Sequence, residues 1–109
     1  RNKKTNQVLA RQISNGLKLI NNKSNIIIAY EPVWSIGTGV IPKSEDLKKS
    51  VSFIKSKFRK KSPKVLYGGS VNANTIIELK NISIIDGFLI GGASQDPKKF
   101  IDIIKKTYN

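Results

Sequence analysis

One stretch of the chain, residues 29–39, reads A-Y-E-P-V-W-S-I-G-T-G and guides the interpretation of the segments around it. It continues an apolar run from Ile26 to Tyr30, a pattern typical of a strand that is covered on both faces. The run leads directly into one carboxylate, Glu31, and then into a loop that begins with proline and ends in G-T-G. In parallel α/β enzymes, an acid at the carboxyl end of a strand beside a mobile loop is well placed to act as a general base.

Helical and strand-like segments alternate along the whole chain. Helices are predicted over residues 5–21, 44–58, 74–79 and from 97 onward, and strands over residues 26–30, 64–67 and 88–90. Ser44 and Asn74 are the expected N-caps, and Pro97 fits the first position of the last helix. We also expect Asn72 to stabilise a turn and Asp86 to form a turn or pair with a lysine. The order α-β-α-β-α-β-α predicts a parallel sheet with right-handed crossovers.

Three parallel strands cannot form a closed structure by themselves. They leave two unpaired edges, and strands this apolar need a layer on each face. A complete (β/α)8 barrel takes about 250 residues, whereas the chain has 109 and begins with Arg1. We therefore expect residues 1–109 to be one C-terminal segment of a single barrel domain, with three parallel strands and four helices, in a barrel that this segment leaves incomplete.

Composition limits the classes of function that the chain can have. Its formal net charge of +13 raises the hypothesis of a nucleic-acid-binding module. The lysines, however, lie on the polar sides of the predicted helices without interleaved aromatic residues for base stacking. We expect no nucleic-acid partner, and no membrane partner because no long apolar stretch occurs. The chain contains no cysteine and no histidine, so we expect no metal and no cofactor; the absence of cysteine fits a reducing cytoplasm.

Two glycine pairs follow the later strands. They occur in Tyr67-Gly68-Gly69-Ser70 and in Ile90-Gly91-Gly92-Ala93. Glycine lets backbone N–H groups approach a phosphate closely, and loops after the last two strands of barrels often bind phosphate in this way. One such pair would be an ordinary turn, but two that follow successive strands favour a phosphate site.

Together these three segments closely resemble the triosephosphate isomerase family, over essentially the whole chain but only the C-terminal part of the family's protein. The resemblance implies the C-terminal part of a TIM (β/α)8 barrel. It also implies interconversion of dihydroxyacetone phosphate and D-glyceraldehyde 3-phosphate, in glycolysis and gluconeogenesis, by a cytoplasmic homodimer. The expected partner is a triose phosphate substrate.

The resemblance also implies a role for individual residues. Glu31 would be the general base, and Tyr67 would touch the closed lid. Phosphate contacts would come from Gly37, Ser70, Gly91 and Gly92, and the rest of the lid would be Pro32, Val33, Trp34, Ser35, Ile36, Thr38 and Gly39. Trp34 is expected to be a packing anchor at the base of the lid. One departure follows the lid, where many family members have a Lys-Thr-Ala type of exit and this chain has Val40-Ile41-Pro42.

The family also uses electrophiles that this chain does not supply. By resemblance, a lysine and an asparagine near the family's N-terminus would lie upstream of Arg1, and the family's histidine has no counterpart here. We therefore expect the segment alone to be inactive. Two alternatives stay open from sequence: another phosphate-binding barrel, such as a relative of indole-glycerol-phosphate synthase, and a non-catalytic basic module that binds nucleic acid.

Overall fold

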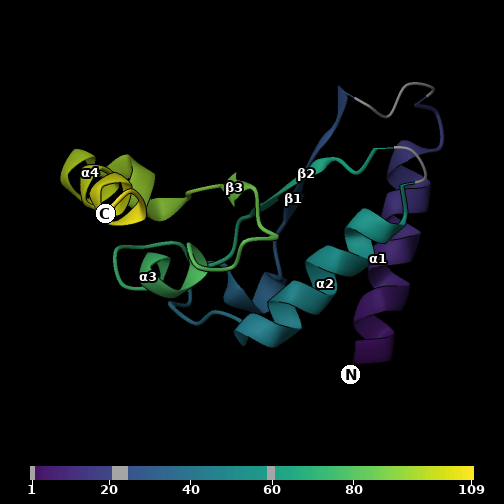
Figure 1. Cartoon of the computed structure of the whole chain (residues 1–109), viewed down its shortest axis with the longest axis horizontal. Helices are drawn as coiled ribbons and strands as arrows, with labels where there is room; N and C mark the ends of the chain where they lie inside the picture. Colours follow the sequence, from purple (N-terminus) through teal and green to yellow (C-terminus); the bar gives the residue numbers. More distant parts are fainter. Residues whose placement is uncertain (1, 21–24, 59–60) are drawn as a thin grey trace.

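The computed structural model describes residues 2–20, 25–58 and 61–109 (Figure 1). In chain order the elements are α1 (Asn2–Leu17), β1 (Ile27–Tyr30), the 3-10 helix η2 (Val33–Ser35), α2 (Ser44–Ser56), β2 (Lys64–Tyr67), α3 (Ile76–Leu79), β3 (Gly87–Phe88), the 3-10 helix η3 (Gly92–Gln95) and α4 (Pro97–Thr107). The predicted alternation of four helices and three strands is confirmed.

The three strands form one parallel sheet in the order β1-β2-β3. Tyr30 pairs with Tyr67, which in turn pairs with Phe88, so the carboxyl ends of all three strands meet at one edge. Two further bonds extend the ladder beyond the strands, from Gly68 N to Tyr30 O at 2.9 Å and from Leu89 N to Tyr67 O at 2.9 Å. Over the described residues the sheet does not close on itself. This is the expected incomplete barrel.

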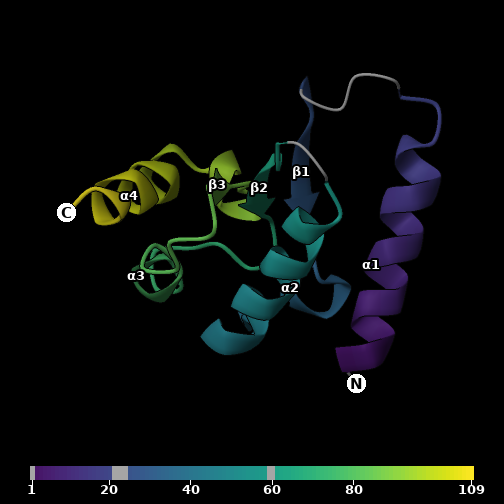
Figure 2. The same cartoon turned by 45° about the vertical axis from the view of Figure 1, so that its right-hand side comes forward.

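The helices lie in two neighbouring pairs, α1 beside α2 and α3 beside α4, which both views of the molecule show (Figures 1 and 2). The core lies where α2 and α3 meet β2. Its most deeply buried side chains are Leu47, Val51, Ile54, Val65, Tyr67, Ile76, Leu79 and Ile103. Burial of one such aliphatic side chain contributes about 1.5–3 kcal/mol. This core fixes β2, and with it the loop that follows β2.

One face of β1 departs from the sequence prediction. The strand was expected to be covered on both faces, but Ile27 is 64% exposed, whereas Ile28 and Tyr30 are half-buried. Successive side chains of a strand point to opposite faces, and the described helices pack on only one of them. The second face of β1 therefore carries apolar side chains that the described residues leave uncovered.

Several element boundaries also differ from the prediction. Helix α1 ends at Leu17, and its expected end at Asn21 lies outside the described residues. Lys43, not Ser44, is the N-cap of α2, and no side chain caps this helix. The last strand stops at Phe88 instead of Ile90. The last residue of β2, Tyr67, is the partner of Phe88, so β2 has no further residue to pair with a longer β3.

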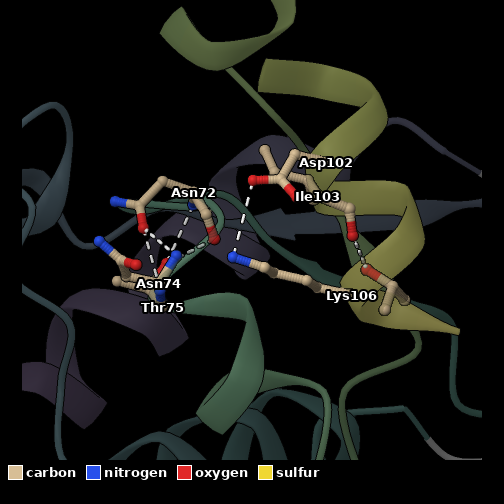
Figure 3. Close-up of polar contacts among 7 residues, drawn as sticks. Asn72, Asn74, Thr75, Asp102, Ile103 and Lys106 are labelled. Carbon is tan, nitrogen blue, oxygen red and sulfur yellow. Dashed lines mark hydrogen bonds and ion pairs between the residues drawn. The ribbon is translucent and has the colours of Figure 1, made fainter. Parts of the chain in front are cut away.

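The start of α3 is organised by Asn72 and not by the expected cap Asn74. The Asn72 side-chain oxygen accepts hydrogen bonds from the backbone N–H groups of Asn74 and Thr75, both at 2.9 Å (Figure 3). Asn72 thus stabilises a turn, as predicted, and the helix begins two residues beyond Asn74, at Ile76. An asparagine side chain that bonds the backbone two residues on is a common turn device.

An ion pair fixes the entry to β3. Asp86 Oδ2 lies 2.9 Å from Lys55 Nζ and accepts a hydrogen bond from Val65 N at 2.8 Å. Lys55 also donates to Ile84 O at 3.0 Å. Burial acts to raise the pKa of Asp86, but the Val65 amide and the Lys55 ammonium outweigh it and hold that pKa below its usual value. The predicted pairing of Asp86 with a lysine is confirmed, and it joins α2 to the β2–β3 connection.

Candidate functional site

A cleft of about 540 Å³ lies at the carboxyl ends of the three strands. Each strand supplies part of its wall: Glu31 follows β1, Gly68 to Val71 follow β2, and Gly91 to Ala93 follow β3. The loop after Glu31 adds Ile36, Gly37 and Gly39. The structure therefore brings together five residues predicted for the site, namely Glu31, Gly37, Ser70, Gly91 and Gly92.

Glu31 lies against the first glycine after β2. A Cβ atom placed on Gly68 would lie 2.7 Å from Glu31 Cγ and 3.0 Å from Glu31 Oε1. Real Cβ atoms essentially never approach other atoms within 3.0 Å. The position of this carboxylate therefore depends on the absence of a side chain at residue 68, a role that the sequence analysis did not assign to Gly68.

The loop after Glu31, residues 32–39, is the expected lid and is compact. Pro32 is the N-cap of η2, and its carbonyl accepts a hydrogen bond from Ser35 N at 2.8 Å. Gly37 and Gly39 have φ angles of 70° and 78°, which favour glycine because other L-residues rarely adopt them. Trp34 is 55% exposed, so the expectation that it is a packing anchor is wrong in this structure.

Hydrogen bonds fasten the lid to the loop after β2. Ser70 Oγ accepts a bond from Gly39 N at 2.8 Å and donates one to the Ser35 carbonyl. The Tyr67 hydroxyl lies 2.7 Å from Ser35 Oγ. Tyr67 thus contacts the loop that is expected to be the lid, and Ser70 bonds to Ser35, before the G-T-G turn, and to Gly39, its last residue.

Tyr67 is completely buried beneath the lid. Burial raises the pKa of its hydroxyl, and hydrogen bonding with the Ser35 side chain and the Ser70 backbone opposes that rise without cancelling it. The hydroxyl is therefore protonated at neutral pH and is available as a hydrogen-bond donor.

The glycines after β3 lie in a more open part of the cleft. Gly91 is the N-cap of η3, and its carbonyl accepts bonds from Ser94 N at 2.9 Å and Ser94 Oγ at 2.6 Å. A Cβ on Gly91 or Gly92 would meet no atom within 4 Å. The backbone here is accessible to a group that enters the cleft.

Helix α4 closes the far side of the cleft with Lys99, Asp102 and Ile103, which the sequence analysis missed. Figure 3 shows Asp102 on α4 with Lys106, whose Nζ lies 3.6 Å from Asp102 Oδ2. The spacing i, i+3, i+4 places the three residues on one helix face. The apolar pattern of this helix favours Phe100, Ile101 and Ile104 for its inner face, but Ile101 and Ile104 are exposed and Ile103 is buried instead.

The cleft presents the carboxylates of Glu31 and Asp102, the Lys99 ammonium group, the Ser70 hydroxyl and backbone amides. Among the described residues, no three His, Cys, Asp or Glu side chains gather where they could hold a metal ion. A search of the same residues for a helix long and apolar enough to cross a membrane found none. The groups at hand suit proton transfer by Glu31 and anion binding by backbone N–H groups.

Comparison with known proteins supports the resemblance to triosephosphate isomerase. A family model described as triosephosphate isomerase matches residues 1–107. The triosephosphate isomerase of Thermodesulfovibrio yellowstonii is 44% identical over 110 residues, covering 95% of this chain and 45% of that relative. The corresponding protein of Candida albicans is 42% identical over 108 residues, with 93% and 43% covered. That of Mycoplasma mobile is 45% identical over 102 residues, with 94% and 42% covered.

These matches decide between the barrel families left open by sequence. The chain spans less than half the length of the curated relatives that it matches. The similarity nevertheless extends from the first helix to the last and includes the lid and both glycine pairs. This continuous match is not expected of a relative of indole-glycerol-phosphate synthase. The chain belongs to the triosephosphate isomerase family.

Proposed function

We propose that this chain supplies the general base, the lid and the phosphate-binding loops of a triosephosphate isomerase. The substrate class is a triose phosphate, interconverted between dihydroxyacetone phosphate and D-glyceraldehyde 3-phosphate. The observation that carries the proposal is the shared cleft: Glu31 lies on one wall, Gly91 and Gly92 on another, and the lid over them is bonded to Ser70.

In this proposal the Glu31 carboxylate removes a proton from the carbon next to the substrate carbonyl. The electrons of the broken C–H bond form the carbon–carbon double bond of an enediolate, and the carbonyl oxygen receives the negative charge. Glu31 then returns the proton to the neighbouring carbon, while the hydroxyl proton moves from the first enediolate oxygen to the second, so that the new carbonyl forms, the former carbonyl oxygen becomes a hydroxyl and the carboxylate is regenerated. Gly68 supports this role because it leaves room for the Glu31 side chain.

The phosphate of the substrate would contact Gly37, Ser70, Gly91 and Gly92, with backbone N–H groups as the donors at the glycines. Such contacts need bare backbone, and the accessible glycines after β3 offer it. The lid would then exclude water from the enediolate, which otherwise loses phosphate.

The activity is proposed for a complete barrel and not for this chain alone. The resemblance assigns carbonyl polarisation to a lysine, an asparagine and a histidine, and the chain contains no histidine. An oxyanion without such donors is stabilised far less, commonly by a factor of 10²–10³ in rate for one donor. We accordingly propose that residues 1–109 are one segment of a single barrel domain. The complete protein would act as a cytoplasmic homodimer in glycolysis and gluconeogenesis.

The test is the Glu31→Asp variant in the complete barrel, assayed with a triose phosphate. Shortening the side chain by one methylene keeps the charge but withdraws the base from the carbon. We expect kcat to fall by on the order of 10²-fold with a much smaller change in KM. The matched control is Glu45→Asp, an exposed acid in the first turn of α2 that does not line the cleft. Near-normal turnover of Glu31→Asp would show that Glu31 is a structural acid and would end the isomerase proposal.

A further inference from the structure

Ser35 differs from its neighbours in the lid. Its side chain is 0% exposed, whereas Val33, Trp34 and Ile36 are 83%, 55% and 50% exposed. The lid therefore leaves three apolar residues exposed and buries one hydroxyl. A buried hydroxyl costs free energy unless it is hydrogen-bonded, so this arrangement requires an explanation.

The Ser35 hydroxyl makes three contacts. Its Oγ donates to Val40 O at 2.5 Å, accepts from Ser70 N at 3.2 Å, and lies 2.7 Å from the Tyr67 hydroxyl. A serine hydroxyl has one proton to donate and two lone pairs. Because its proton goes to Val40 O, Tyr67 must be the donor in the pair with Ser35. All of the hydrogen-bonding capacity of Ser35 is then used.

These three bonds join parts of the chain that the lid must bring together. Ser35 lies near the start of the lid, Val40 lies just after it, and Tyr67 and Ser70 belong to the end of β2 and the loop beyond it. The site is also built tightly around the hydroxyl. A Cβ on Gly69 would lie 2.5 Å from Ser35 Oγ and would also meet the Tyr67 hydroxyl.

We propose that Ser35 is a positioning residue whose buried hydroxyl holds the lid over the cleft before any substrate binds. The hydroxyl ties both ends of the lid to Tyr67 and to the Ser70 backbone, next to the bond from Gly39 N to Ser70 Oγ. A lid held in this way need not be ordered by the ligand. Its consequence for turnover rests on the proposed isomerase function, but the bonds that hold the lid do not.

The lid can be observed without substrate in the 109-residue chain. Trp34 is the only tryptophan and adjoins Ser35, so quenching of its fluorescence by acrylamide reports on the lid. Amide hydrogen exchange at Gly39, relative to exchange at Leu79 N in α3, separates lid opening from global unfolding. For Ser35→Ala we expect stronger Trp34 quenching and about tenfold faster relative exchange at Gly39, the factor that loss of one or two net hydrogen bonds gives.

A second variant removes the other partner of the bond between Ser35 and Tyr67. Tyr67→Phe removes the partner hydroxyl and retains the ring, so it should also accelerate relative exchange at Gly39. Because both changes remove the same contact, the double variant should show less acceleration than the product of the two single effects. The control is Ser56→Ala, which removes an exposed hydroxyl that donates to Phe53 O at 2.6 Å in α2.

Unchanged relative exchange at Gly39 in both Ser35→Ala and Tyr67→Phe would overturn the proposal. Independent, multiplicative effects of the two changes would do the same. None of these measurements uses a triose phosphate, so their failure leaves the role of Glu31 untouched. Conversely, a fully active Glu31→Asp enzyme would remove the isomerase proposal and leave the lid bonds in place.

Discussion

The two glycine pairs that follow β2 and β3 lie on the same cleft but in opposite surroundings. Gly68 and Gly69 are buried, and a Cβ on either would collide with Glu31, Ser35 or Tyr67. Gly91 and Gly92 are exposed, and a Cβ on either would meet nothing within 4 Å. Packing thus explains the glycines of the first pair. For the second pair the described residues give no steric reason, which supports our proposal that these glycines leave the backbone free for a phosphate.

The largest difference between the two glycine pairs is expected in how much a substitution lowers the free energy of unfolding. Gly69→Ala places a methyl group against the Tyr67 hydroxyl and Ser35 Oγ, both fully buried. Such overpacking costs typically about 1–3 kcal/mol, and we expect the upper end of that range because the neighbours cannot move without breaking the lid bonds. Gly91→Ala, as the matched control, should change the free energy of unfolding by less than about 0.5 kcal/mol. Urea unfolding followed by circular dichroism measures both. Equal losses would show that the contrast between the two pairs is wrong.

A smaller and separable difference is expected in the kinetics of the complete barrel. Gly68→Ala displaces the Glu31 side chain and should lower kcat by about tenfold, with little change in KM. Gly92→Val puts a side chain into the open part of the cleft and should raise KM instead. Steady-state assays with a triose phosphate distinguish the two patterns. A raised KM for Gly68→Ala, with kcat unchanged, would contradict the assignment of Gly68 to the base.

The smallest effect on stability is expected at Asp86. This residue contacts neither glycine pair, so its loss should affect both sides of the cleft alike. Because the pKa of Asp86 is lowered in the folded chain, its stabilisation is fully present above the ordinary aspartate pKa of about 3.9. It is lost as the pH falls through the lower, folded value. Asp86→Asn keeps an acceptor for Val65 N but removes the charge, and we expect it to cost about 1 kcal/mol at pH 7.

That loss should disappear under acid, where wild type and Asp86→Asn should unfold alike. The control is Asp102→Asn, whose pair with Lys106 is longer, at 3.6 Å, and more exposed. It should cost at most about 0.5 kcal/mol. Thermal unfolding from pH 7 down to pH 3 provides the measurement. An Asp86→Asn loss that persists unchanged at pH 3 would mean that the charge is not its cause.

The sequence predicted those features that local pattern determines. The predicted helix over residues 44–58 corresponds to α2, in which Leu47, Val51 and Ile54 are buried. Pro97 marked the start of α4, where Asp96 accepts from Lys98 N at 2.9 Å. The order of strands and glycine turns also placed Glu31 and the glycines at one end of the sheet. All of these depend on residues close together in the chain or on the general geometry of parallel sheets.

Features that depend on distant contacts were beyond that reasoning. The sequence assigned Ser35 to the lid but gave its hydroxyl no role, because its partner Tyr67 is 32 residues away. Gly68 was assigned to a turn, since the side chain that requires it belongs to the neighbouring strand. Trp34 was expected to be a packing anchor of the lid and Ile27 to lie in a strand covered on both faces. Both side chains are more than half exposed, because the described residues provide no full covering layer at either position. The N-cap at Lys43 shows that a favourable cap residue does not fix a helix start by itself.

The sequential order β1-β2-β3 has a consequence for how such a sheet can assemble. Each strand pairs with the strand that follows it along the chain, so no segment has to be held unpaired until a distant one arrives. Pairing with the next strand keeps each closed loop as short as the connecting segment allows, which limits the loop-closure entropy. During synthesis, β1 could pair with β2 as soon as α2 had formed between them, and β3 could then add to the growing edge. The same order leaves the outer edge of β1 available to any strand that precedes it.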